Sequence, residues 1–179
     1  MDLASIVDSI QASGVGEWMR SSVKAMPIVE AIHVMAAATV FGTVLVVDLR
    51  LLGFPSTQRP FTRVSDELLK WTWAAFVVAL ITGGLMFAAN AHTYYVNTAF
   101  RLKMLALLGA GLNMAVFHTV TCRTVRAWDQ GVPAPLAGRL AGAASILIWV
   151  TLIFLARWIG FTKGYDFDVP QDVNLDFTF

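Results

Sequence analysis

Residues 71–91 read WTWAAFVVALITGGLMFAANA and contain no Asp, Glu, Lys or Arg. A helix rises about 1.5 Å per residue, so a run of this length spans the hydrocarbon core of a bilayer, which is about 30 Å thick. Three further runs of similar composition occupy residues 31–47, 104–122 and 140–156. The sequence therefore predicts an all-α integral membrane protein with four transmembrane helices. Because the connections are short, we expect one up-down-up-down bundle.

The composition of the 179-residue chain supports this prediction. Apolar residues make up 57% of the chain and charged residues 14%, and the mean hydropathy is +0.65. A soluble domain carries about 25% charged residues. Disorder is excluded by the low charge, and a disulfide-stabilised scaffold is excluded because Cys122 is the single cysteine. The net charge of +1 gives no electrostatic basis for binding nucleic acid.

The N-terminal segment, residues 1–25, is predicted to lie in the membrane interface. Leu3, Ile6, Val7 and Ile10 recur with the spacing of one helix face, which indicates a short amphipathic helix before a turn at Ser13-Gly14. The bundle itself is expected over residues 26–162. Pro27 suits the first turn of the first span, where its missing N–H costs nothing.

The C-terminal tail, residues 163–179, is predicted to be acidic and extended. Its last residues alternate between apolar and polar side chains, with the apolar ones at Val173, Leu175, Phe177 and Phe179, and a period of two is typical of a strand. We expect this tail to dock on another subunit of a membrane complex. The alternative is a frayed terminus.

The basic residues set the predicted orientation. Loops one and three hold seven of the 13 Lys and Arg residues, namely Arg50, Arg59, Arg63, Lys70, Arg123, Arg126 and Arg139. The positive-inside rule then predicts that loops one and three are cytoplasmic and that both termini lie outside, which in a bacterial inner membrane is the periplasmic side.

A small set of ionisable residues near one membrane face forms the predicted site. Glu30 and His33 lie three residues apart on one helix face, and His92 ends the run that returns to that face. Two imidazoles could ligate a b-type haem, with Arg157 or Arg101 available for a propionate, and Glu30, His33 and His92 together could hold a copper ion. His118 lies near the opposite face, so His33 and His118 are too far apart to share one haem.

Each of these polar residues also has a purely structural interpretation. The histidines could hydrogen-bond between helices, and His92 could belong to the aromatic belt. Asp48 and Arg50 are interpreted as a packing device, with Lys70 or Arg123 as partners for Asp48. Ser145 is expected to have no acid and histidine at its depth, so no hydrolytic triad is predicted.

Three stretches carry a resemblance to known families. Glu30-Ala-Ile-His33, Asp48-Leu-Arg50-Leu-Leu-Gly53 and Asn97-Thr-Ala-Phe100-Arg-Leu-Lys103 resemble a bacterial family of small four-span membrane proteins of unknown function, over about residues 25–160. A weaker resemblance extends to CopD-type copper-resistance domains and to HemJ-type haem-binding membrane oxidases. In that resemblance His33 matches the early-helix histidine and Lys103 the lysine that starts a helix. The resemblance implies copper handling or b-haem redox chemistry.

Three functions are therefore considered. The first is electron transfer through a b-haem or metal near the outer face, to quinone or a partner protein. The second is copper handling of the CopD kind. The third is a non-catalytic accessory subunit of a larger membrane complex, in which every polar group serves packing.

Overall fold

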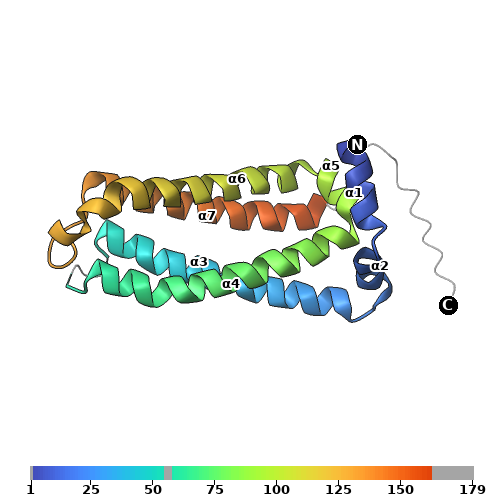
Figure 1. Ribbon diagram of the computed structural model, residues 1–179, viewed down its shortest axis with the longest axis horizontal. Coiled ribbons are helices and arrows are strands. Elements are labelled where there is room, and N and C mark those ends of the chain that lie inside the picture. Colours follow the sequence, from blue (N-terminus) through green and yellow to red (C-terminus); the bar gives the residue numbers. More distant parts are fainter. Residues whose placement is uncertain (1, 55–57, 163–179) are drawn as a thin grey trace, which may run out of the picture.

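The computed structural model describes residues 2–54 and 58–162, and the regular structure within these ranges is entirely helical. In Figure 1 the long helices run side by side and short helices lie across one end. In chain order the elements are α1 (Leu3–Gln11), α2 (Gly14–Ser21), α3 (Ala25–Leu52), α4 (Phe61–Ala89), α5 (Ala91–Val96), α6 (Thr98–Val116), the π-helical turn η1 (Phe117–Thr121), the 3-10 helix η2 (Cys122–Ala127) and α7 (Leu136–Thr162). The predicted C-terminal tail lies outside the described residues.

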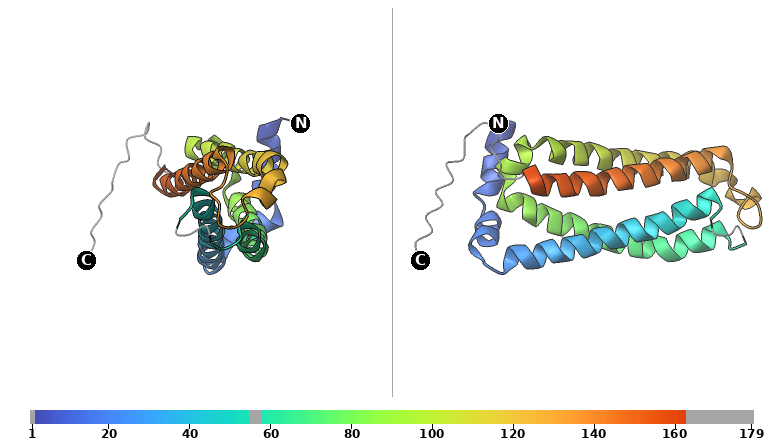
Figure 2. Two further views of the ribbon diagram at one scale, coloured as in Figure 1. Left: turned by 90° about the vertical axis from the view of Figure 1, so that its left-hand side faces the viewer. Right: turned by 180° about the vertical axis from the view of Figure 1, so that it is seen from behind.

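Four helical segments are long and apolar enough to cross a membrane, as predicted. They are Ala25–Leu52, Phe61–Ala89, Thr98–Ala127 and Leu136–Thr162, with 27 to 30 residues each and mean hydropathies between 1.5 and 2.0. Helices of this length extend about 40 Å, so they continue beyond the hydrocarbon core into the interface. The protein is therefore a multi-pass membrane protein built as an all-α, four-helix bundle whose helices alternate in direction (Figure 2).

The bundle consists of two helical hairpins joined along one seam. α3 packs against α4, α6 packs against α7, and α3 also packs against α7. At the α3–α7 crossing, a Cβ atom on Gly142 would lie 3.2 Å from both the Asp48 carbonyl oxygen and the Leu51 Cβ. The absence of a side chain at Gly142 therefore allows the two backbones to approach closely.

The N-terminal end of the bundle is closed by α1 and α2, which lie across the ends of the long helices (Figures 1 and 2). Ser13 caps α2 by accepting a hydrogen bond from the Gly16 N–H, so the predicted turn at Ser13-Gly14 is confirmed. Arg20 Nη1 donates to the carbonyl oxygens of Gln11 and Ala89 at 2.8 and 2.9 Å. These bonds hold α2 against the C-terminal end of α4, where helix carbonyls lack partners within the helix.

The opposite end of the bundle is sealed by a structured cap that joins the first and third connections. Phe61 is 2% exposed and packs with Leu51, Phe117, Trp128 and Ala134. Its ring lies 5.8 Å from the Phe117 ring and 5.1 Å from the Trp128 ring, measured between centroids. We call this group of five side chains the loop-end cluster.

Polar bonds reinforce the loop-end cluster. Buried Arg50 donates from Nε to the Arg59 carbonyl at 2.9 Å and from Nη2 to the Asp129 carbonyl at 2.8 Å. The Asp129 carboxylate accepts from the Thr62 N–H at 2.8 Å and from the Thr62 hydroxyl at 2.9 Å, and so caps the start of α4. The predicted packing role of Arg50 therefore takes the form of side-chain bonds to loop carbonyls.

The expected partners of Asp48 are wrong. The described residues contain no ion pair between Asp48 and Lys70 or Arg123, and the polar neighbour of its carboxyl group is Ser145 on α7. The sequence suggested Lys70 and Arg123 because they are basic residues beside the other predicted spans, at the end of the bundle where Asp48 lies. The crossing at Gly142 instead brings the inner face of α7 onto Asp48.

Candidate functional site

His33 lies inside the bundle, half-buried between α3 and α4. Its Nδ1 is 3.0 Å from the Thr82 hydroxyl oxygen, and that hydroxyl donates its one proton to the Val78 carbonyl at 2.7 Å. Thr82 therefore accepts from His33, which assigns the proton to Nδ1 and leaves the lone pair on Nε2. The backbone of Ala79, on the same face of α4, also interacts with the His33 ring.

Charged side chains surround His33. Lys103 on α6 and Glu30 on α3 are both close enough to interact electrostatically with the imidazole. Lys103 is half-buried, whereas Glu30 is exposed on the surface of the bundle. The sequence placed Glu30 beside His33 correctly, because an i, i+3 spacing puts two residues on one helix face.

His92 lies apart from His33. Thr82, the partner of His33, is seven residues before the end of α4 at Ala89, which corresponds to about 10 Å of helix. His92 follows in α5 and is 60% exposed. Its Nδ1 lies 3.5 Å from Asp8 Oδ1, and its N–H donates to Gln11 Oε1 at 2.9 Å. His92 therefore joins α5 to α1.

The predicted metal ligands do not assemble into one group. No set of three His, Cys, Asp or Glu side chains in residues 2–54 and 58–162 is placed to hold a metal ion. Arg157, expected near a haem propionate, is exposed, and its guanidinium carbon lies 4.9 Å from the Phe161 ring centroid. Haem and copper binding stay predictions.

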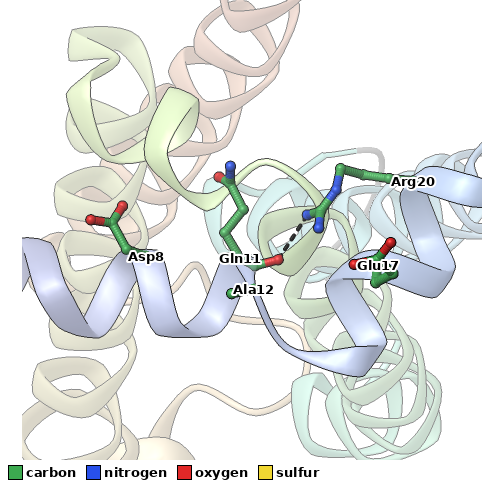
Figure 3. A pocket seen from close by; sticks show the side chains of 5 residues that line it. All are labelled: Asp8, Gln11, Ala12, Glu17 and Arg20. Atoms are coloured by element: carbon green, nitrogen blue, oxygen red, sulfur yellow. Dashed lines mark hydrogen bonds between the residues drawn. The ribbon is translucent and has the colours of Figure 1, made fainter.

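An open hollow also lies at the N-terminal end, with a volume of about 340 Å³. Asp8, Gln11, Ala12, Glu17 and Arg20 line it, and Figure 3 shows the Arg20 guanidinium bonded to the Gln11 carbonyl. Arg20 is the one basic residue that lines this hollow, and its hydrogen bonds connect α2 to α1 and to the end of α4. The polar groups of this hollow therefore hold the short helices against the bundle, and we do not assign a reaction to them.

A second cavity lies between all four long helices, next to the loop-end cluster. Its volume is about 120 Å³, and a cavity needs only about 10–15 Å³ to hold a water molecule. Six of its lining side chains are polar: Asp48, Ser65, Thr72, Asn113, His118 and Ser145. This combination of a bundle interior and convergent polar groups makes it the best candidate functional site in the described chain.

Asp48 is the central group of this cavity. The residue is 6% exposed, and its Oδ2 atom accepts no hydrogen bond from any described residue. Ser145, also buried, is its polar neighbour. A carboxylate buried in this way without a counter-charge is costly, and ionisable groups inside a membrane protein are functional candidates by default.

The remaining polar groups frame the cavity. Asn113 donates from Nδ2 to the Ala141 carbonyl at 3.0 Å, which fixes the amide and leaves its oxygen as an acceptor. The Thr72 hydroxyl lies 2.8 Å from that of Thr43. His118 holds its Nδ1 at 2.9 Å from the Met114 carbonyl, so Nδ1 carries the proton and Nε2 the lone pair.

Ser145 does have an acid and a histidine near it, contrary to our expectation, because Asp48 and His118 line the same cavity. Their arrangement differs from a hydrolytic triad. His118 bonds to Met114 rather than to Ser145 or Asp48, whereas a triad requires the histidine to bridge the serine and the acid. A serine, an acid and a histidine thus line the same cavity, but they do not form the hydrogen bonds of a hydrolytic triad.

The wall of the cavity includes an irregular stretch of helix. At Phe117–Thr121 the α6 helix widens into the π-helical turn η1, which contains two lining residues, Phe117 and His118. Short π-helical turns are often found at functional sites. One signal for this site is visible in the sequence: Asp48, Asn113 and Ser145 are polar residues within or bordering apolar runs.

Comparison with known proteins adds a family but no activity. A model described as "Family of unknown function (DUF6644)" matches residues 17–162. No curated protein and no solved structure matches the chain. The match confirms the expected resemblance to an uncharacterised family, and it includes all four long helices.

Proposed function

The chain belongs to this family of unknown function, and we propose that it is a proton-coupled membrane protein that takes up and releases a proton at Asp48. The observation that carries the proposal is Oδ2 of Asp48, a buried carboxyl oxygen that no described residue hydrogen-bonds. The adjoining cavity is large enough for several water molecules. Such a site lets a proton reach the carboxyl group.

Electrostatics favours a proton on this group. An isolated carboxylate in an apolar interior has lost its hydration, and it commonly becomes neutral instead of remaining charged. No described Lys or Arg forms an ion pair with Asp48 that would hold it ionised. Binding and release of one proton then changes the charge inside the bundle, next to the loop-end cluster, by one unit.

The first test is infrared spectroscopy of the protein in nanodiscs at neutral pH. We expect a carbonyl-stretch band of a protonated carboxylic acid that shifts in D2O and disappears in Asp48→Asn. This substitution keeps the size of the side chain and its contact with Ser145. Exposed acids are ionised at this pH, so Asp66→Asn, which removes an exposed acid on α4, should leave the band unchanged.

A spectrum in which Asp48→Asn keeps the full wild-type band would overturn the proposal, because the protonated acid would then be another group. The same holds if wild-type protein lacks the band altogether. Circular dichroism and monodisperse elution of both variants establish that the bundle is intact when the bands are compared.

Redox chemistry at His33 is the second candidate function, favoured by the lone pair on Nε2. Metal-ligating histidines characteristically bond their other ring nitrogen to a neighbouring group, as His33 does to Thr82. A b-haem or a copper ion held there would supply one-electron chemistry for transfer to quinone, in line with the weaker family resemblances. His92 and Arg157 serve other contacts, so this proposal rests on His33 alone.

Absorption spectra and metal analysis of the purified protein test this second candidate. We expect a Soret band, or bound copper after copper loading, that is lost in His33→Ala and kept in His92→Ala. Protein that is colourless and metal-free after supply of haem and copper would count against redox chemistry. A signal lost in both variants would instead restore the predicted pair of ligands.

A further inference from the structure

We propose that His118 is the relay through which protons reach Asp48, and this inference rests on the proton-binding function proposed above. Of the 16 residues that line the cavity, two have side chains of the kinds that serve as proton donors and acceptors, Asp48 on α3 and His118 in the π-helical turn η1. One is an acid and the other a base, and they belong to the two different hairpins of the bundle.

The position of His118 suits a relay. Unlike Asp48, it is exposed at the surface of the bundle while also lining the cavity. It lies five residues before Arg123 along the chain, so it is close to the end of its membrane span. A side chain that lines the cavity close to the end of a membrane span can exchange a proton between the membrane interface and the cavity.

The hydrogen bonds of His118 set its chemistry. Because Nδ1–H donates to the Met114 carbonyl at 2.9 Å, Nε2 is the nitrogen that gains and loses the transferable proton. The neighbouring Phe117 ring stands edge-on to the imidazole, with centroids 5.6 Å apart. Phe117 is itself buried in the loop-end cluster, so the residue next to His118 is fixed by packing.

The proton transfer balances without any further reactant. His118 with a proton on both ring nitrogens gives the Nε2 proton to the carboxylate of Asp48, which leaves a neutral imidazole and a neutral carboxylic acid. Release runs in the opposite direction. Water in the cavity, with the Ser145 hydroxyl beside the acid, can carry the proton across any gap between the two groups.

If His118 carries protons to Asp48, it determines how fast the Asp48 proton exchanges with solvent, and this exchange rate can be measured. After rapid mixing of nanodiscs with D2O, the downshift of the Asp48 infrared band gives this rate directly. Removal of a positioned acid–base group slows proton transfer by about 10²-fold, so we expect a slowing of that order in His118→Gln. Free imidazole added to His118→Ala should restore part of the lost rate.

The matched control is Thr119→Val, which alters the next residue of the same π-helical turn outside the cavity lining. Its exchange rate should equal that of the wild type. If His118→Gln exchanges as fast as the wild type while the Asp48 band is present, the relay is overturned and the proton-binding function stands. If no band depends on Asp48, the proposed function itself fails.

Discussion

Replacement of Phe61 by alanine is expected to lower the free energy of unfolding by about 3–5 kcal/mol, the range found for large aromatic truncations in protein cores. Phe61 is 2% exposed and contacts the rings of Phe117 and Trp128. The truncation removes both ring contacts and opens a void in the loop-end cluster. Because α3, α4 and the third connection meet there, little of the surrounding structure can relax into the void.

Reversible unfolding of the protein in mixed micelles, followed by circular dichroism, gives the change in free energy. Phe54→Ala is the matched control, since Phe54 lies in the connection that leads to Phe61 but is 67% exposed. Its replacement should change the free energy by no more than about 0.5 kcal/mol. Equal losses in the two variants would show that the loop-end cluster does not hold the bundle together.

The four membrane spans are predictable from the sequence because the signal is local. The run at residues 71–91 identifies one helix by its own composition, and α4 does cover most of it. The amphipathic pattern of Leu3, Ile6, Val7 and Ile10 likewise marks α1 correctly. Such patterns depend on residues a few positions apart in one helix, so they can be recognised without knowing how the helices pack.

The position of His92 shows where this reasoning fails. The uncharged run continues to Ala91, so His92 was expected to end the helix. α4 instead stops at Ala89, and Asn90 has an extended φ of −141°, so His92 belongs to α5 and faces α1. Hydropathy reports whether residues tolerate lipid, and it does not report where the backbone leaves the helix.

The cavity around Asp48 could not be predicted for a different reason. Its lining comes from all four long helices, and their mutual register depends on crossings such as that at Gly142. An error of two residues in one helix would turn Asn113 or Ser145 away from Asp48. The sequence marks these residues as polar within apolar surroundings, while their convergence is a property of the packed bundle.

Replacement of Arg50 by alanine should have the other large effect on stability, a loss of about 3–5 kcal/mol, because two buried hydrogen bonds from a charged group are removed and each contributes about 1.5–3 kcal/mol. The guanidinium is buried and bonds the carbonyl oxygens of Arg59 and Asp129. Without it these carbonyls lose charge-assisted bonds. The same Asp129 carbonyl accepts from the Phe61 N–H at 2.9 Å, so the polar bonds and the apolar cluster should weaken together.

Arg50→Lys separates geometry from charge in the same unfolding measurement. A lysine keeps the charge but cannot present the guanidinium fork to two carbonyls, so it should recover only a minor part of the loss. Arg63→Ala is the matched control: Arg63 pairs with Glu67 on the exposed surface of α4, and such pairs contribute about 0.3–0.5 kcal/mol. Full stability in Arg50→Lys would mean that charge alone, rather than the two directed bonds, joins the connections. Because Phe61 and Arg50 share the Asp129 segment, the double variant should lose less than the sum of the two single losses.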